Sequence, residues 1–239
     1  TIKSVLADTL TLQPKYNGDD LGNLSDTVEF VPGAFKDITA NGTTFAVTAG
    51  FPSTGYTDNG SIPKSVSKAA FTLNMPAGKT ATDYTWTSDQ SWVSVSSAGV
   101  VTFIDDATAD TKTVNISAIS NSTGQSLQYT FTVKTWYKVR ANDGLTWAQG
   151  NTYCSSLGMA TPSLAQLSSG TYVRKIGSLW AEWGSLITTD KIQSGLDVWY
   201  KTTSGPSGTH TIVGAVNGNS INYTDNENAG VGTVCFKSL

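Results

Sequence analysis

Short runs in which apolar and polar residues alternate, between positions 45 and 134, constrain this chain more than any other feature of its sequence. The alternation recurs at Phe45 and Val47, Phe71 and Leu73, Val93 and Val95, Val101 and Phe103, Val114 and Ile116, and Tyr129 and Phe131. Side chains two positions apart lie on one face of a strand, so each run predicts a strand with one buried face. Turn residues such as Ala98-Gly99 separate the runs. The spacing predicts an antiparallel β-sandwich with Trp86 in its core and no cysteine.

The first 44 residues contain further strand-like pieces, at residues 9–12 and 28–31, and they are broken by residues 16–22 and by Pro32-Gly33. Two interpretations stay open. The pieces are either leading strands of the same sandwich or the remainder of a preceding domain. We therefore assign residues 1–135 to the sandwich, with that alternative for residues 1–44.

The sequence changes character at Trp136, where tryptophan becomes frequent and a helical pattern appears. Thr146 can cap a helix whose buried stripe contains Tyr153, Cys154 and Leu157, and Gly158 can end it. Further helical pieces are predicted at residues 164–167 and 173–183, and strands at residues 198–201, 212–216, 220–223 and 231–236. Residues 136–239 are thus predicted to form an α+β domain that follows the sandwich without a linker, in a chain that is mostly β overall.

Both cysteines lie in this second domain, Cys154 in the predicted helix and Cys235 in the last strand. Their wide separation excludes a CxxC redox or zinc pair. A bridge between them would close a long loop, which is worth ~4–5 kcal/mol in the chain-entropy model and suits an oxidising compartment. The alternative is a pair of buried free thiols.

Composition limits the classes of partner. Charged residues make up 14% of the chain and the formal net charge is −3, and neither half is basic enough to indicate binding of nucleic acid or an anionic membrane. No apolar run approaches the ~20 residues that a membrane-spanning helix needs. No signal-like segment opens the chain, so we expect a soluble piece of a longer protein.

Catalytic and metal-binding patterns are weak. One histidine, His210, lies in a predicted loop, where a solvated side chain is a better interpretation than a catalytic base. Zinc would need more histidine or free cysteine than the chain has, and no phosphate-binding glycine motif follows a strand. Asp105, Asp106 and Asp110 are clustered, but they lack the ligand spacing of a Ca²⁺ loop and are interpreted as a polar loop. We expect a protein that is not an enzyme and uses no cofactor or metal.

Tryptophans at 136, 147, 180, 183 and 199 could form a stacking platform for sugars. A domain of this size needs large side chains in its core, so most of them are expected to be buried. Trp180 or Trp183, beside Glu182, is the candidate for an exposed one.

Two stretches resemble known domain families. Residues Trp86-Thr87-Ser88-Asp89, followed by Val93, Val95 and Gly99 to Phe103, resemble the bacterial immunoglobulin-like (Ig-like) repeat, and residues 51–56 are similar to the same repeats. Trp136-Tyr137-Lys138, the helix from Leu145 to Cys154 and the closing Val234-Cys235-Phe236 resemble a C-type lectin-like domain. An Ig-like sandwich running directly into a terminal lectin-like domain with a single disulfide resembles the tip of the invasin/intimin family of bacterial adhesins.

That resemblance implies a function outside the cytoplasm. Members of the family are anchored in the bacterial outer membrane by a β-barrel, which is not in this chain, and they display a stalk of Ig-like domains with the lectin-like domain outermost. The resemblance also implies a disulfide between the first helix and the last strand, here Cys154 and Cys235. The expected partner is a host cell-surface or secreted protein.

Two differences from related domains limit the class of ligand that this chain is expected to bind. Sugar-binding lectin domains coordinate Ca²⁺ through a proline-containing carboxylate loop, but Pro206 has no carboxylates beside it, and the cluster from Asp225 to Asn228 is interpreted as a solvated turn. Integrin-binding members use an aspartate just after the first helix, whereas residues 155–159 contain none. Integrin binding by that route is therefore not expected, and another receptor or an immunoglobulin is the alternative.

Binding is expected in loops of the terminal domain, at residues 188–195, 203–210 and 217–230, where polar and aromatic side chains suit a protein interface. The candidate ligand-binding residues are Asp190, Lys191, Tyr223, Asp225 and Glu227. Two alternatives stay open, a carbohydrate-binding module and a purely structural stalk segment.

Overall fold

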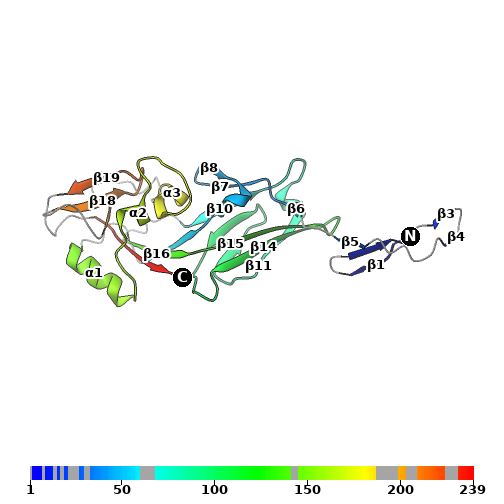
Figure 1. Cartoon of the computed structure of the whole chain (residues 1–239), viewed down its shortest axis with the longest axis horizontal. Coiled ribbons are helices and arrows are strands. Elements are labelled where there is room, and N and C mark those ends of the chain that lie inside the picture. The colour runs from blue at the N-terminus through cyan, green and yellow to red at the C-terminus, as the bar shows by residue number, and fades with distance from the viewer. Residues whose placement is uncertain are drawn as a thin grey trace.

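The computed structural model describes residues 33–59, 68–140, 145–186, 199–202, 209–223 and 231–239, and the backbone of five short strands before residue 30. The molecule is elongated (Figure 1). The first strands lie at one end, a two-sheet sandwich occupies the middle, and an α+β domain forms the other end.

The strands before residue 30 pair with one another among the described residues. A three-stranded antiparallel sheet has the order β1-β2-β5, and β3 pairs with β4. Their bounds are β1 Ile2–Leu6, β2 Thr9–Leu12, β3 Lys15–Tyr16, β4 Asp19–Asp20 and β5 Thr27–Glu29. Of the first 44 residues, those from Gly33 onward are hydrogen-bonded into the sandwich that follows.

Two sheets form the sandwich. The five-stranded sheet has the order β12-β13-β10-β7-β8 and the four-stranded sheet the order β11-β14-β15-β6. Their bounds are β6 Gly33–Ala34, β7 Asp37–Ala40, β8 Thr43–Phe45, β10 Ala70–Asn74, β11 Tyr84–Ser88, β12 Val93–Val95, β13 Val100–Phe103, β14 Thr113–Ser120 and β15 Ser126–Thr132. All pairs are antiparallel except β15 with β6.

The predicted alternation is clearest in β14, where Val114, Ile116 and Ala118 are fully buried and the residues between them face outward. Its neighbour β15 alternates in register, so that Val114 pairs with Phe131 and Ile116 with Tyr129. The inner faces of both strands therefore meet the opposite sheet, as the period of two requires.

The centre of the sandwich core is Trp92 rather than Trp86. Trp92 is buried beside Phe103 and Phe131, and its indole Nε1 donates to Thr111 O at 2.9 Å. Trp86 is only half-buried and stacks on Phe35 at the edge. Another difference lies at Val47–Ala49, which was predicted as a strand but forms the 3-10 helix η1; a second such helix, η2, spans Ala81–Asp83.

A third sheet joins the sandwich to the terminal domain. It has the order β20-β16-β9, in which β9 (Thr54–Asp58) comes from the sandwich part of the chain and β20 (Thr233–Ser238) is the last strand. The central strand β16 (Thr135–Arg140) pairs parallel with β9 and antiparallel with β20. Gly55 permits this close approach, because a Cβ there would lie 2.3 Å from the Trp136 ring.

Among its described residues, the terminal domain packs three helices and a second sheet around β16 and β20 (Figure 1). The helices are α1 Trp147–Ser156, α2 Leu164–Leu167 and α3 Leu179–Trp183, and the sheet β17-β18-β19 comprises Trp199–Lys201, His210–Gly214 and Ser220–Tyr223. The predicted helix at 173–183 is therefore shorter, since it begins only at Leu179. In the part of the chain that the structure describes, no helix has the length and apolarity to cross a bilayer.

Candidate functional site

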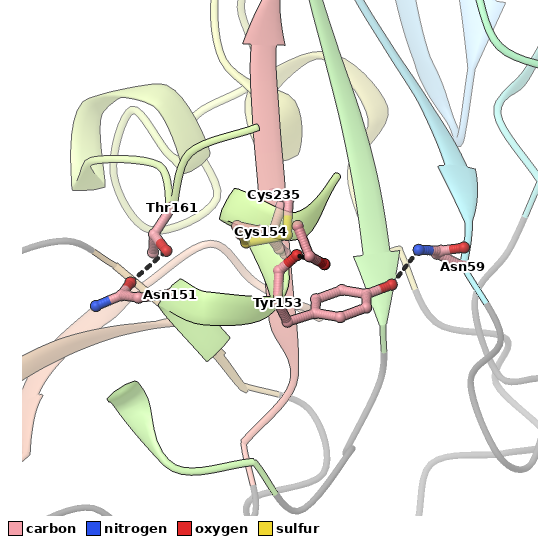
Figure 2. The surroundings of a disulfide bond; sticks show 8 residues. Asn59, Asn151, Tyr153, Cys154, Thr161 and Cys235 are labelled. Carbon is pink, nitrogen blue, oxygen red and sulfur yellow. Dashed lines mark hydrogen bonds between the residues drawn. A yellow bond between two sulfur atoms is a disulfide. The ribbon is translucent and has the colours of Figure 1, made fainter. Parts of the chain in front are cut away.

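A disulfide fixes the first helix of the terminal domain to its last strand, as predicted. Cys154 in α1 and Cys235 in β20 are bonded with an S–S distance of 1.97 Å and a Cα–Cα distance of 5.2 Å. Figure 2 shows the bond between the helix and the strand, and both cysteines are fully buried. The described residues contain no free cysteine, so the alternative of two thiols is wrong.

Local signals in the sequence set both ends of α1. Thr146 Oγ1 accepts from Gln149 N at 3.1 Å while Gln149 Oε1 accepts from Thr146 N at 2.9 Å, which is a complete capping box. At the other end Gly158 takes a φ of +66° and turns the chain back. Leu157 was expected on the buried stripe, but it is 40% exposed, because the helix ends at Ser156 before its stripe can continue.

Polar contacts surround the disulfide (Figure 2). The amide of Asn59, just after β9, donates to the Tyr153 hydroxyl, and Thr161 Oγ1 donates to Asn151 Oδ1 at 2.5 Å. The Arg140 guanidinium lies 4.7 Å from the centre of the Tyr153 ring. These contacts connect α1 to the end of β9 as well as to its own domain.

The aromatic pair of α3 faces inward, which corrects the expectation that Trp180 or Trp183 is exposed. Trp180 is 4% and Trp183 3% exposed. The Trp183 ring packs against Phe51, Tyr56 and Phe103, and its Nε1 donates to Thr54 Oγ1 at 3.0 Å. Trp183 therefore fills the core at the boundary between the sandwich and the terminal domain. Burial of this large aromatic ring is more favourable than its exposure to solvent.

Between those tryptophans, Glu182 is fully buried. Its carboxylate accepts from the backbone N of Ser53, Thr54 and Gly177 at 3.0, 2.9 and 2.8 Å. The hydroxyls of Ser53 and Thr54 donate to it as well. The Glu182 side chain of α3 thus accepts hydrogen bonds from the residues at the start of β9, which precedes the terminal domain in the sequence.

The protonation of Glu182 follows from this environment. Burial raises the pKa of its carboxyl above the usual range for glutamate, although the bonds from Ser53, Gly177 and Thr54 act in the opposite direction. The loss of hydration is the larger effect, since no cation pairs with the carboxylate in the interactions that the structure gives for it.

A second carboxylate at the boundary behaves differently. Asp106 Oδ1 accepts from Lys138 Nζ and Thr57 Oγ1, each at 2.6 Å, and from Trp136 Nε1 at 3.0 Å. Burial raises the pKa of Asp106, but Lys138 and these donors outweigh that effect and lower it overall. Its oxygens are thus occupied by protein donors. Within the described residues no group of His, Cys, Asp and Glu could hold a metal ion.

Arg174 provides a third connection between the two parts. Its guanidinium donates to Ala40 O at 3.0 Å, Asn41 O at 3.2 Å and Glu182 O at 2.8 Å. Asn41 in turn donates from its side chain to Ser185 O at 3.2 Å. The turn between β7 and β8 is therefore fixed to α3.

Four of the five predicted ligand-binding residues lie outside the part of the chain that the structure describes. Asp190, Lys191, Asp225 and Glu227 lie outside the described residues, and so does Pro206. Tyr223 ends β19, where its backbone pairs with His210 at the open end of the hairpin. His210 stacks on the buried Trp147, with ring centres 4.2 Å apart. The histidine is therefore packed on a ring, rather than free in a loop as predicted.

One feature that the sequence analysis missed is a cluster of exposed apolar residues near the turn between β18 and β19. Tyr172 is 71%, Val173 41% and Val216 37% exposed. Tyr172 N donates to Asn217 O at 2.8 Å, which places the two segments side by side. The signal available in the sequence is the run Ser168-Ser169-Gly170, whose composition is typical of a turn, just before Tyr172 and Val173.

Comparisons with known proteins agree with this arrangement. The family profile for Invasin, domain 4, matches residues 36–131. The inverse autotransporter adhesin YeeJ of Escherichia coli (strain K12) is 33% identical over 189 residues, which are 75% of this chain and 7% of that protein. This chain therefore spans only a small part of the length of its relative.

Solved structures share the fold. The crystal structure of invasin, described as a bacterial integrin-binding protein, matches with a TM-score of 0.68 at 24% identity, over 97% of this chain and 44% of that one. Intimin from EHEC O157:H7 matches with a TM-score of 0.54 at 16% identity, over 84% of this chain and 96% of that one. The fold is thus an Ig-like β-sandwich followed by a C-type lectin-like domain.

Proposed function

Because the chain belongs to the invasin/intimin family of bacterial adhesins, we propose that it is the receptor-binding tip of a bacterial surface adhesin and that loops of its lectin-like domain bind a host protein. The proposal extends to display at the outer membrane, outside the cell. It assigns no catalytic activity to the chain.

The observation that carries this proposal is the shared sheet β20-β16-β9. Its central strand leaves the sandwich and enters the lectin-like domain with hydrogen-bonded partners on both sides. The hairpin β18–β19 lies at the opposite end of the molecule from β1–β5 (Figure 1). A terminal domain that is fixed on a rod presents its loops at a constant distance and orientation, which lowers the entropy that binding must overcome.

The candidate residues for the contact are Asp190, Lys191, Tyr223, Asp225 and Glu227, since exposed tyrosine and charged side chains commonly anchor protein interfaces. The ligand class is a host cell-surface or secreted protein. Integrins are named for the invasin structure, but residues 155–159 of this chain contain no aspartate, so another receptor or an immunoglobulin is the preferred partner.

Binding of the fluorescently labelled intact chain to cultured human intestinal epithelial cells and to immobilised serum proteins, immunoglobulin included, tests the proposal. Two variants, Asp190→Ala with Lys191→Ala, and Tyr223→Ala with Asp225→Ala and Glu227→Ala, should bind at least tenfold more weakly. Removing residues 136–239 is a poor control, because it would strip β16 from β9 and uncover Phe51 and Tyr56. No binding of the intact chain would contradict an adhesin tip, and equal binding of both variants would contradict these loops as the contact.

A further inference from the structure

We propose that Tyr172, Val173 and Val216 form a contact patch for an acidic, apolar region of a partner protein. The patch deepens the proposed function, on which it rests, because it names a binding surface among the described residues. Its three side chains are the exposed ones quoted above, and Tyr172 is the most exposed of the large apolar residues there.

The backbone of Tyr172 supports a functional role. Its φ is +58°, in the left-handed region that costs an L-residue free energy and that glycine or asparagine usually occupies. Val173 N bonds to Gly170 O at 3.2 Å, so Tyr172 is the third residue of a tight turn. The other described non-glycine residue with positive φ, Asn41, precedes Gly42 in a hairpin turn, where that sequence is favoured. Stability alone therefore favours glycine over tyrosine at position 172.

Hydrogen bonds of Ser168 hold the turn in place. Ser168 Oγ accepts from Gly170 N at 3.1 Å and donates to Gly218 O, which ties the turn to the β18–β19 loop. Arg174 follows and is fixed to α3 and to Ala40 of the sandwich. An aromatic side chain on a fixed backbone loses little conformational entropy on binding, which suits an anchor residue.

Charge selects the kind of partner. Residues 145–186 contain three charged side chains, Arg174, Lys175 and Glu182, and the one acid is fully buried. Lys175 is exposed, three positions from Tyr172. Among the described residues of this segment, the exposed charge is therefore the positive one of Lys175, which complements a carboxylate-bearing partner. The aliphatic flanks, Val173 and Val216, offer no hydrogen bonds to sugar hydroxyls, so a protein fits this patch better than a glycan.

The test uses the same cell-binding measurement with Tyr172→Gly and Lys175→Glu variants of the intact chain. Glycine relieves the backbone, so we expect an unchanged or higher melting temperature together with at least tenfold weaker binding. Lys175→Glu should weaken binding at least threefold, more at low salt than at high salt. Ile104→Ser is the matched control, since Ile104 is 54% exposed on the sandwich and should leave binding unchanged.

The outcomes separate this inference from the proposed function. Binding of Tyr172→Gly at the level of the unmodified chain would overturn the patch alone. No binding by the unmodified chain would contradict both proposals. Trypsin treatment of the cells should abolish binding while enzymatic removal of glycans should not. The reverse result would overturn the protein partner in favour of a glycan.

Discussion

The strands of the sandwich bury a continuous set of apolar side chains and use no disulfide, whereas the lectin-like domain adds a disulfide and polar bonds to its neighbour. In the sandwich, Phe71, Phe103 and Phe131 pack against one another between the sheets. In the lectin-like domain, Cys154 is bonded to Cys235, and Glu182 and Arg174 bind the backbone of the sandwich. The lectin-like domain therefore adds to its own contacts a set of bonds that cross the boundary to the sandwich side.

The difference teaches where the boundary of a folding unit lies. Trp183 belongs to the lectin-like domain by sequence, but it packs in the same core as Phe51 and Phe71. A core that crosses a boundary without a linker couples the two parts, so that each domain's stability depends on the other.

Removing the disulfide should change the relative stability of the two domains more than any other substitution. The double change Cys154→Ala and Cys235→Ala frees the closed loop and is expected to cost ~4–5 kcal/mol of unfolding free energy. The lectin-like domain should then unfold at lower guanidinium concentration than the sandwich, which contains no disulfide. Near-ultraviolet circular dichroism would follow the two transitions. A single transition at the original midpoint would show that the bridge contributes little.

Truncating the tryptophan at the boundary tests the shared core. Trp183→Ala should lower the unfolding free energy by about 4 kcal/mol, since it leaves a large cavity between Phe51, Tyr56 and Phe103. Trp180→Ala is the matched control, because Trp180 lies on the same helix and bonds to Ala215 O at 3.1 Å. Hydrogen exchange should show lost protection in β9 and β10 only for Trp183→Ala. Equal effects of both changes on those strands would argue against a core specific to Trp183.

Neutralising Glu182 tests how the buried carboxyl at the boundary makes stability depend on pH. Glu182→Gln places an amide among backbone donors and is expected to cost about 2 kcal/mol at neutral pH. The pKa of Glu182 is higher in the folded chain than in the unfolded chain, so the folded chain keeps a proton that the unfolded chain has lost. The protonated carboxyl therefore contributes to stability at low pH. That contribution is lost as the pH rises from the usual glutamate pKa to the pKa of Glu182 in the folded chain. Urea denaturation at several pH values should show this slope in the original protein and not in the variant.

Asp106 should show the opposite dependence. The pKa of Asp106 is lower in the folded chain than in the unfolded chain. The ionised Asp106 therefore contributes to stability at pH values above the usual aspartate pKa, and this contribution is lost as the pH falls through the pKa of Asp106 in the folded chain. Asp106→Asn should cost about 1 kcal/mol, since the side chain is partly exposed. The same pH series measures it, with Asp105→Asn as the control. A dependence of the same sign as that of Glu182 would contradict the pairing with Lys138.

Much of the architecture followed from local patterns. The period of two in β14, the cap at Thr146 and the position of Gly158 act over a few residues, so the sequence alone predicts them. The pairing of β16 with β9 joins residues about eighty positions apart, and no local pattern encodes it. Trp92 was missed because it lies in the turn just before β12 rather than within an alternating run.

The candidate site was less predictable than the fold. Glu182 and its tryptophans resemble an exposed polar and aromatic segment, and only the donors of Ser53 and Thr54 explain why a carboxylate is buried there. Tyr172 gives no signal in the alternation of residues either. Its exposure depends on a turn and on a distant hairpin. Of the predicted binding residues only Tyr223 falls within the described backbone, so that part of the site stays a prediction.

The strand β16 also has a mechanical consequence. In the proposed role as an adhesin tip, a pull between the terminal domain and the base of the molecule would put tension along β16, which connects the two domains. Because β9 runs parallel to β16, a pull along the strand loads their hydrogen bonds together in shear instead of opening them one after another. The junction between the two domains, where a flexible linker would extend first, should therefore be a rigid transmitter of force.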